Sequence, residues 1–273
     1  MIVSAPASAT RTVDLRNGLT ITVDEYGTGG EGTAVLLLHG GAGPRSAAGF
    51  AEALAEHASV IVPTHPGFEG TPRPASTNSI TDLALAYLDL IEQLKLAQVL
   101  VIGSSIGGWI ASEMALLDNR SRISGLVLLG SVGLQPTPPV EIVDAARISP
   151  REFFQRAYQN PYLRPDAATL TEERWAAIAA NQRAVAVYAD APYMHDPKLR
   201  GRLHRVRVPV LVVWGAQDGI APLEYGRAFA DAFPRARFES IANAGHYPHV
   251  EQPNAVLAVL ADFVAAEAGP GAH

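Results

Sequence analysis

The residue with the clearest chemical capacity is Ser105, at the centre of the pattern Gly103-Ser104-Ser105-Ile106-Gly107. An apolar run of strand length, Val99–Ile102, precedes this pattern, and a segment with helical character follows it. A chain that reverses so tightly holds its central serine in a strained conformation and projects the hydroxyl outward. Glycine two positions to either side leaves room for the turn. The pattern therefore predicts a nucleophilic serine, and the alternative is a turn with a structural role only.

A serine nucleophile needs a base that accepts its proton and an acid that orients the base. His246 follows the predicted strand Phe238–Ile241 on a loop that contains Gly245. Asp218 follows the predicted strand Val210–Trp214. Both side chains are therefore expected beyond the ends of strands, as Ser105 is. Taken alone, Asp218 could instead cap the next helix, and His246 could be a turn residue bonded to backbone.

The order Ser105, Asp218, His246, with each residue after a strand, resembles the α/β-hydrolase superfamily, and the similarity spans about residues 19–266. This resemblance implies a catalytic triad of Ser105, Asp218 and His246 that needs no cofactor. The loop after the predicted strand 126–129, where some members of the family carry the acid, contains no carboxylate, which favours Asp218. Serine at the turn argues against the haloalkane dehalogenase and epoxide hydrolase branches, which place aspartate there.

The segment His39-Gly40-Gly41-Ala42-Gly43-Pro44 resembles the His-Gly loop that follows the third strand in this family. The resemblance implies that the backbone N–H of Gly41, or less favourably that of Ala42, pairs with the N–H of Ile106 as an oxyanion hole. Each such donor stabilises the transition state by on the order of 3 kcal/mol. His39 is expected to hold the loop by a side-chain hydrogen bond.

The elements that must position these residues alternate along the chain. Apolar runs predict strands buried on both faces, at Ala34–Leu38, Val60–Val62, Val99–Ile102, Leu126–Leu129 and Val210–Trp214. Thr20–Val23 alternates and predicts an antiparallel strand near a sheet edge, joined to the first buried strand by a turn at 27–32. Helices are expected at 79–96, 221–233 and 253–266. The alternation predicts an α/β fold with a mostly parallel sheet of about eight strands and helices on both faces.

One stretch, 134–206, contains no convincing buried strand, and prolines and helical segments dominate it. We expect a helical lid inserted after strand 6 over the carboxyl edge of the sheet, with residues 1–133 and 207–273 as the hydrolase core. The alternative is a helical subdomain whose aromatic residues form their own core. The candidates to line a substrate pocket are Ala42, Phe68, Trp109, Phe153 and Phe154. For Phe68, a role in a rigid turn is the alternative.

Composition excludes several classes of function. The net charge is −6, which gives no support to nucleic-acid binding, and the absence of cysteine removes disulfides, zinc–thiolate sites and thiol nucleophiles. Residues 27–32 match G-x-G-x-x-G, but a strand follows where a dinucleotide site requires a helix. His246, His249 and Glu251 lack a metal-binding pattern, so we expect no metal. No signal peptide or membrane span is recognisable, so a cytoplasmic protein is expected, and its oligomeric state stays open.

The favoured function is hydrolysis of a small-molecule ester, as a carboxylesterase or lactonase, through an acyl-enzyme on Ser105. The runner-up is a carbon–carbon bond hydrolase of the meta-cleavage type, because the loop around Gly41 is similar to that of this branch. Ser104 argues against it, since members often carry asparagine there, and only Arg164 and Arg183 are candidates for the arginine that binds the substrate carboxylate. A third reading is a non-enzymatic small-molecule receptor on a hydrolase scaffold.

Overall fold

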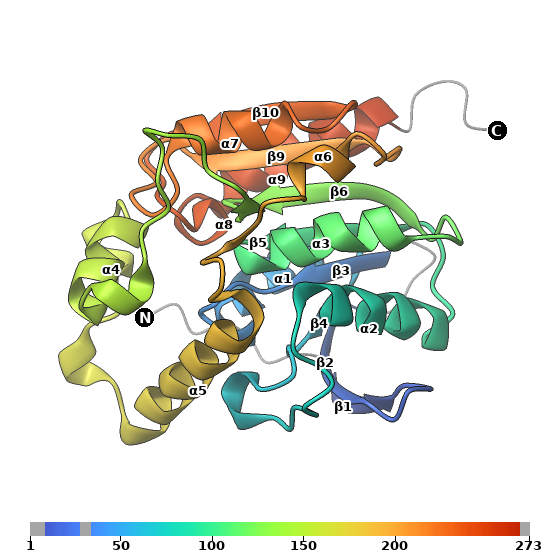
Figure 1. The fold of residues 1–273 in the computed structure, drawn as a ribbon, viewed down its shortest axis with the longest axis horizontal. Coiled ribbons are helices and arrows are strands. Elements are labelled where there is room, and N and C mark those ends of the chain that lie inside the picture. The colour runs from blue at the N-terminus through green and yellow to red at the C-terminus, as the bar shows by residue number, and fades with distance from the viewer. Residues whose placement is uncertain (1–8, 28–33, 268–273) are drawn as a thin grey trace.

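The protein has an α/β fold built on one large sheet, as shown by a computed structural model that describes residues 9–27 and 34–267. The eight strands of the main sheet are β1 (Ala9–Asp14), β2 (Thr20–Tyr26), β3 (Ala34–Leu38), β4 (Ser59–Pro63), β5 (Val99–Ser104), β6 (Ile123–Leu129), β9 (Val210–Gly215) and β10 (Ala236–Ile241). Their order is β1-β2-β4-β3-β5-β6-β9-β10 (Figure 1). Strand β2 runs antiparallel to β1 and β4, and the pairs from β4 to β10 are parallel. The predicted fold class is confirmed.

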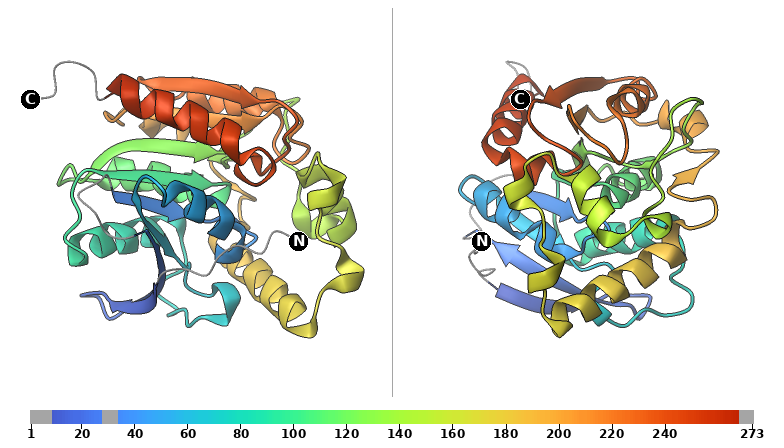
Figure 2. Two further views of the ribbon diagram at one scale, coloured as in Figure 1. Left: turned by 180° about the vertical axis from the view of Figure 1, so that it is seen from behind. Right: turned by 90° about the vertical axis from the view of Figure 1, so that its left-hand side faces the viewer.

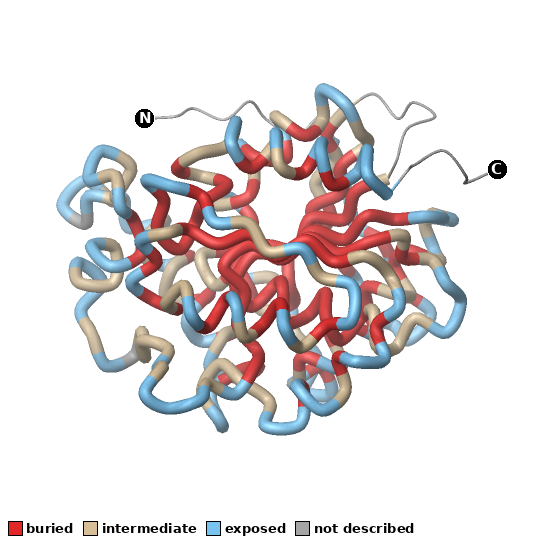
Figure 3. The backbone as a smooth tube through the Cα atoms, turned by 90° about the horizontal axis from the view of Figure 1, so that it is seen from above, coloured by how far each residue is buried: buried red, intermediate tan, exposed pale blue. Residues whose placement is uncertain are grey.

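Helices cover both faces of this sheet. They are α1 (Ala48–Leu54), α2 (Ile80–Gln93), α3 (Ile106–Leu117), α7 (Leu223–Ala230), α8 (Pro248–Glu251) and α9 (Pro253–Glu267). Successive strand residues pack on opposite sides, so Val101 joins the core under α2, α3 and α7, and Ile102 joins the core under α1 and α9. Figure 2 shows α1 and α9 from behind, and Figure 3 shows the strands buried through the centre. Burial on both faces explains why these strands are apolar at consecutive positions.

The predicted strands and helices lie at nearly the observed positions in the sequence, whereas the strand partners become clear only from the structure. Helix α2 begins after Ser79, whose side chain accepts a hydrogen bond from Asp82 N in a capping box. Strand β1 was not predicted, because its pattern is mostly exposed. Strand β2 is antiparallel as expected, yet it pairs with β1 and β4 and not with β3. Residues 28–32 of the expected turn lie outside the described residues.

The segment between β6 and β9 departs from the alternation of strands and helices. It contains α4 (Pro150–Ala157), α5 (Glu172–Ala189), α6 (Arg200–Leu203) and short 3-10 turns, with a two-residue pair of β7 (Gly133–Leu134) and β8 (His195–Asp196). Helices α4 and α5 lie beyond the carboxyl end of β6 (Figure 1). The segment 134–206 is therefore helical and adds no strand to the main sheet, and its function as a lid stays a prediction. Among the described residues, no helix has the length and apolar character needed to cross a membrane.

Candidate functional site

Ser105 lies at the junction of β5 and α3, in a backbone conformation that is rare for a residue with a side chain. Its φ is 52° and its ψ is −117°. Such a conformation costs about 1–3 kcal/mol and persists only when its surroundings hold it. Here Ser105 N donates to Leu129 O at 2.9 Å, and Val132 N donates to Ser105 O at 3.2 Å. The end of β6 therefore fixes the strained turn, as a nucleophile elbow requires.

The glycines around Ser105 are required by close contacts between backbones. A Cβ atom on Gly107 would lie 2.3 Å from Leu38 O, and one on Gly103 would lie 2.3 Å from Gly107 O. A Cβ atom on Gly108 would overlap the Ser131 side chain. The turn can therefore be this tight, and α3 can lie this close to β3, only without side chains at these positions.

The structure brings His246 and Asp218 to Ser105. His246 Nε2 lies 3.1 Å from Ser105 Oγ, and His246 Nδ1 lies 2.9 Å from Asp218 Oδ2. Because a carboxylate only accepts, Nδ1 carries the proton and Nε2 is left to accept from the serine hydroxyl. All three residues are buried, with exposed fractions of 8% for Ser105, 2% for His246 and 7% for Asp218. The arrangement can remove a proton from Ser105 in a site shielded from water.

Asp218 also organises its own loop. Its second oxygen, Oδ1, accepts from Ile220 N at 2.8 Å and from Ala221 N at 3.0 Å. Helix α7 begins after Pro222, so Asp218 does not cap that helix. One oxygen of the Asp218 carboxylate thus binds the loop backbone, and the other binds the imidazole of His246.

The C-terminal end of α4 holds the loops that carry Asp218 and His246, a contact that sequence reasoning missed. Ala157 O accepts from His246 N at 2.7 Å, and Arg156 O accepts from Gly219 N at 3.2 Å. A helix leaves its last carbonyls without partners inside the helix, so these carbonyls are available to the loops. The one signal in the sequence was a glycine next to each of Asp218 and His246. These glycines allow the close approach of α4, since a Cβ atom on Gly245 would lie 2.4 Å from Ala157 O.

Glu251 is a second positioning group that the sequence did not reveal. Its Oε2 accepts from Gly245 N at 2.6 Å, and its Oε1 accepts from Asn160 N at 2.7 Å. The residue is buried, with an exposed fraction of 7%. It therefore ties the backbone just before His246 to the segment that follows α4.

The two amides expected to hold an oxyanion come from the residue after Gly40 and from the residue after Ser105. A Cβ atom on Gly40 would lie 3.2 Å from Ser105 Cβ, so the loop after β3 contacts the elbow directly. Within the described residues, neither the Gly41 N–H nor the Ile106 N–H has a hydrogen-bond acceptor. Ile106 is also the first residue of α3, where the helix dipole favours negative charge. Both donors are thus available to an anionic oxygen.

Buried histidines support that loop in their neutral form. His39 Nδ1 donates to Gly40 O at 2.8 Å, and His39 Nε2 accepts from His65 N at 3.1 Å, which agrees with the expected structural role. His65 Nε2 donates to His39 O at 2.9 Å, so Nδ1 accepts from the Tyr87 hydroxyl. Burial lowers the pKa of His65 to about 4 and holds the pKa of His39 well below its usual range. Both rings therefore act as fixed hydrogen-bonding groups at neutral pH.

The five residues expected to line a pocket fall into two groups. Ala42, Phe153 and Phe154 belong to an apolar cluster with Ile220 and Tyr247, two residues close in sequence to Asp218 and His246. In the other group, Phe68 has no exposed surface and packs edge-on against His39 and His65, and Trp109 lies in the main core over Gly133.

Metal ligation has no support in the described part of the chain, where no three His, Asp or Glu side chains cluster. His249, close to His246 in sequence, is buried beside Phe50 and Tyr247. Burial first, and the nearby His246 second, lower the pKa of His249 to about 3. Its side chain therefore belongs to the packing behind the site.

Comparisons with known proteins show the family to which the chain belongs. A family model described as the alpha/beta hydrolase family matches residues 35–259. The chain is 27% identical over 281 residues to the 2-hydroxy-6-oxononadienedioate/2-hydroxy-6-oxononatrienedioate hydrolase 2 of Pseudomonas putida, with 94% of this chain and 97% of the relative covered.

Two solved structures extend the likeness to the whole fold. A thermophilic esterase from Thermogutta terrifontis aligns with a TM-score of 0.74 at 25% identity, over 95% of this chain and 99% of that one. The enol-lactonase from Burkholderia xenovorans LB400 aligns with a TM-score of 0.75 at 22% identity, over 93% and 99%.

Proposed function

Because the chain belongs to the alpha/beta hydrolase family and is a hydrolase, we propose that it cleaves a small-molecule ester, as a carboxylesterase or lactonase, with Ser105 as the nucleophile. The observation that carries this proposal is the hydrogen-bonded series from Ser105 Oγ through His246 to Asp218. The adjacent N–H groups of Gly41 and Ile106 complete the set of groups that acyl transfer requires.

In the proposed reaction, His246 Nε2 takes the hydroxyl proton as Ser105 Oγ bonds to the ester carbon. The carbonyl oxygen gains the electron pair and is held by the N–H groups of Gly41 and Ile106. The intermediate collapses, the bond to the alcohol oxygen breaks, and the Nε2 proton passes to the leaving alcohol. Water then attacks the acyl-enzyme with His246 as base, which releases the acid and restores Ser105. Asp218 stabilises the imidazolium that forms in each half-reaction.

The apolar cluster of Ala42, Phe153, Phe154, Ile220 and Tyr247 supports an uncharged substrate. Carbon-rich surface beside a buried triad favours apolar acyl or alkoxy groups over charged ones, because a charge there would lose its hydration. Helices α4 and α5 act, in this proposal, as the lid over the site, and the burial of Ser105 supports that assignment.

The second candidate is carbon–carbon bond hydrolysis, favoured by the similarity to the 2-hydroxy-6-oxononadienedioate hydrolase of Pseudomonas putida. The two arginines considered for a substrate carboxylate give it little support. Arg164 donates to Tyr158 O at 2.9 Å through Nη2 and at 3.1 Å through Nε, which commits its guanidinium to the backbone. Arg183 is exposed on α5. Ester hydrolysis is therefore the preferred proposal.

The test is labelling by a fluorophosphonate probe together with turnover of short p-nitrophenyl esters. We expect wild type to be labelled and active, Ser105→Ala to lose both, and Ser104→Ala to retain both, because the Ser104 hydroxyl has no hydrogen-bond partner in the described structure. Equal ester turnover by wild type and Ser105→Ala would contradict the serine mechanism. Turnover of a vinylogous diketone without ester turnover would favour the carbon–carbon reaction, and absence of labelling would favour a receptor.

A further inference from the structure

Helix α5 packs against the two loops that meet beside Ser105. Ala184 Cβ lies 3.3 Å from the place that a Cβ atom on Gly67 would take, in the loop after β4. Val185 Cγ2 lies 3.4 Å from the corresponding place on Gly41, in the loop after β3. The inserted segment therefore touches the proposed oxyanion loop directly.

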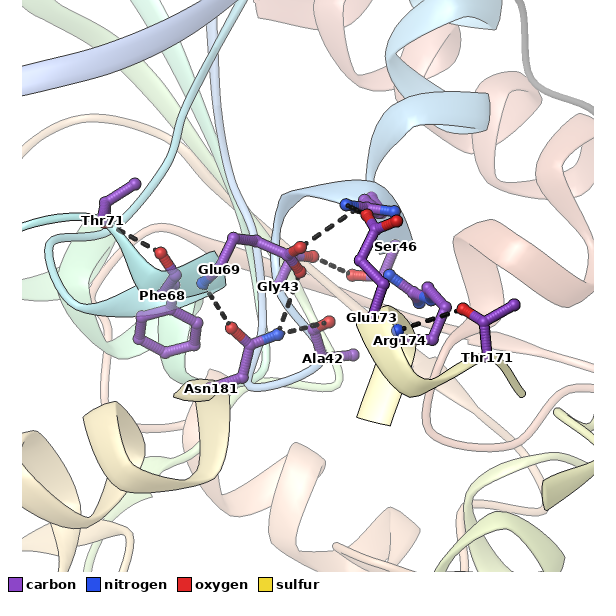
Figure 4. Close-up of polar contacts among 11 residues, drawn as sticks. Ala42, Gly43, Ser46, Phe68, Glu69, Thr71, Thr171, Glu173, Arg174 and Asn181 are labelled. Atoms are coloured by element: carbon purple, nitrogen blue, oxygen red, sulfur yellow. Dashed lines mark hydrogen bonds and ion pairs between the residues drawn. The ribbon is translucent and has the colours of Figure 1, made fainter. Parts of the chain in front are cut away.

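Asn181 is the polar centre of this contact, and its side chain is nearly fully buried, with an exposed fraction of 2%. Its Nδ2 donates to Ala42 O at 3.1 Å and to Glu69 Oε1 at 3.2 Å, and its Oδ1 accepts from Glu69 N at 2.8 Å (Figure 4). Because the Glu69 N–H can only donate, it fixes which side of the carboxamide carries the oxygen. The carboxamide thus spans three elements: α5, the loop after β3 and the turn after β4.

The loop to which Asn181 donates its hydrogen bond also contains Gly41. Gly43 N donates to Gly40 O at 3.1 Å and closes a turn around Gly41 and Ala42. Gly43 has a φ of 89°, and a Cβ atom there would lie 2.4 Å from Asn181 Nδ2. The Asn181 NH₂ group therefore binds Ala42 O, in the same turn that contains the Gly41 N–H. This contact requires glycine at position 43, because a side chain there would overlap the carboxamide.

Glu69 supports Asn181 from the other side. It has a φ of 51°, which a residue with a side chain rarely adopts, and its backbone N–H faces the Asn181 oxygen. Its carboxylate pairs with Arg45 Nε at 3.1 Å, and Arg45 Nη2 pairs at 3.2 Å with Glu173, on the first turn of α5. The carboxylate that accepts from Asn181 is thus itself held in place.

We propose that Asn181 is a positioning residue for the oxyanion loop, which couples the docking of α5 to the orientation of the Gly41 N–H. The inference rests on the proposed function. An oxyanion donor acts in the transition state, so loss of its orientation lowers kcat while substrate binding changes little. The inserted segment is then part of the catalytic geometry as well as a cover over the site.

The test uses Asn181→Asp, which keeps an acceptor for the Glu69 N–H but removes the donor to Ala42 O. We expect kcat for a p-nitrophenyl ester at pH 8 to fall by about tenfold or more, with KM within about twofold of wild type. The matched control is Gln182→Ala, which removes an exposed amide from the next position of α5 and is expected to leave kcat unchanged. Gly43→Ala displaces the same carboxamide from the loop side and is expected to lower kcat similarly.

The pH profile separates positioning from a purely structural role. The new carboxyl group faces the Glu69 carboxylate, with Arg45 and Glu173 behind it, so burial and the like charge raise its pKa. When protonated it loses the repulsion with the Glu69 carboxylate and regains one O–H donor for Ala42 O or Glu69 Oε1, so the ratio of variant to wild-type kcat is expected to rise as the pH falls from 8 to 6. A ratio that does not change with pH, a kcat equal to that of wild type, or a defect in KM alone would overturn the proposal.

Failure of this inference is distinguishable from failure of the proposed function. If wild type shows no Ser105-dependent turnover, the proposed function fails and this inference fails with it. If wild type is active and both Asn181→Asp and Gly43→Ala match it, only the positioning role is wrong. If Asn181→Asp does not fold, Asn181→Ser, which is uncharged and too short to reach Ala42 O, decides by its kcat at an unchanged KM.

Discussion

Asp218 holds His246 through one oxygen only: Oδ2 lies 2.9 Å from His246 Nδ1, while Oδ1 is bonded to the backbone N–H groups of Ile220 and Ala221. The carboxylate cannot rotate to exchange these partners without leaving buried N–H groups unsatisfied. The loop thus fixes the side of the imidazole that carries the proton.

We predict that Asp218→Asn lowers kcat by on the order of 10³- to 10⁴-fold with little change in thermal stability. The asparagine oxygen can keep the two loop hydrogen bonds, which leaves its NH₂ group facing His246 Nδ1. Nδ1 must then accept, so the proton moves to Nε2, which can no longer act as base. The carboxylate of Glu251, which is buried close by in the chain, is bonded to Gly245 N and Asn160 N, so we expect it not to replace Asp218. Steady-state kinetics and melting temperature together check this, and near-wild-type kcat would disprove the assigned role.

We predict that Glu251→Gln lowers both stability and activity. Glutamine has one acceptor oxygen where Glu251 has two, so one of the N–H groups of Gly245 and Asn160 is left facing an NH₂ group. The expected loss is about 1–3 kcal/mol of unfolding free energy, together with a fall in kcat of about tenfold, because Gly245 precedes His246. Urea unfolding and kinetics measure the two effects. Glu224→Gln, at an exposed position of α7, is the control, and an equal response of both variants would contradict the prediction.

We predict that acid destabilises the fold partly through His249. Burial lowers its pKa from 6.5 to about 3, so between these values the unfolded state binds a proton that the folded state excludes. Stability is therefore complete above about pH 6.5 and falls as the pH decreases, by about 2 kcal/mol at pH 5 from this group. His249→Phe is expected to lose less stability between pH 7 and pH 5 than wild type, as measured by urea unfolding. The same substitution at the exposed His204 is expected to leave the pH dependence unchanged, and parallel curves for wild type and His249→Phe would refute the assignment.

We predict opposite effects of alanine at two glycines. Gly107→Ala places a Cβ atom 2.3 Å from Leu38 O and is expected to cost about 3 kcal/mol or more of unfolding free energy, because neither backbone can move freely. Gly49→Ala, on α1, meets no atom within 4 Å and is expected to stabilise by about 0.4–1 kcal/mol. Denaturant midpoints decide the matter. If Gly107→Ala were as stable as wild type, the inference that α3 packs too closely on β3 to admit a side chain at position 107 would be wrong.

Several features of the fold and site could be predicted because their signals are local. Strands β5 and β9 are apolar at consecutive positions because both of their faces are buried. The strained turn at Ser105 requires glycines at fixed offsets, and Gly103 and Gly107 show that requirement directly in the sequence. Ser79 and Asp82 mark the start of α2 in the same way. In each case, the residue type answers a constraint within a few positions of itself.

Contacts between distant segments were decided only by the tertiary structure. The pairing of β2 with β4 and the hydrogen bond from Asn181 to Ala42 O have no local signature. The contact of the C-terminal end of α4 with the loops of Gly219 and His246 left only the glycines beside Asp218 and His246 as a signal. In the sequence, an asparagine on a helix gives the same signal whether its side chain faces solvent or the carbonyl of another loop. The sequence alone determined which backbone segments form strands, helices and the tight turn, because torsion and burial act on each segment separately. Which buried polar group meets which partner depends on how those segments pack, and that appears only when the whole chain is folded.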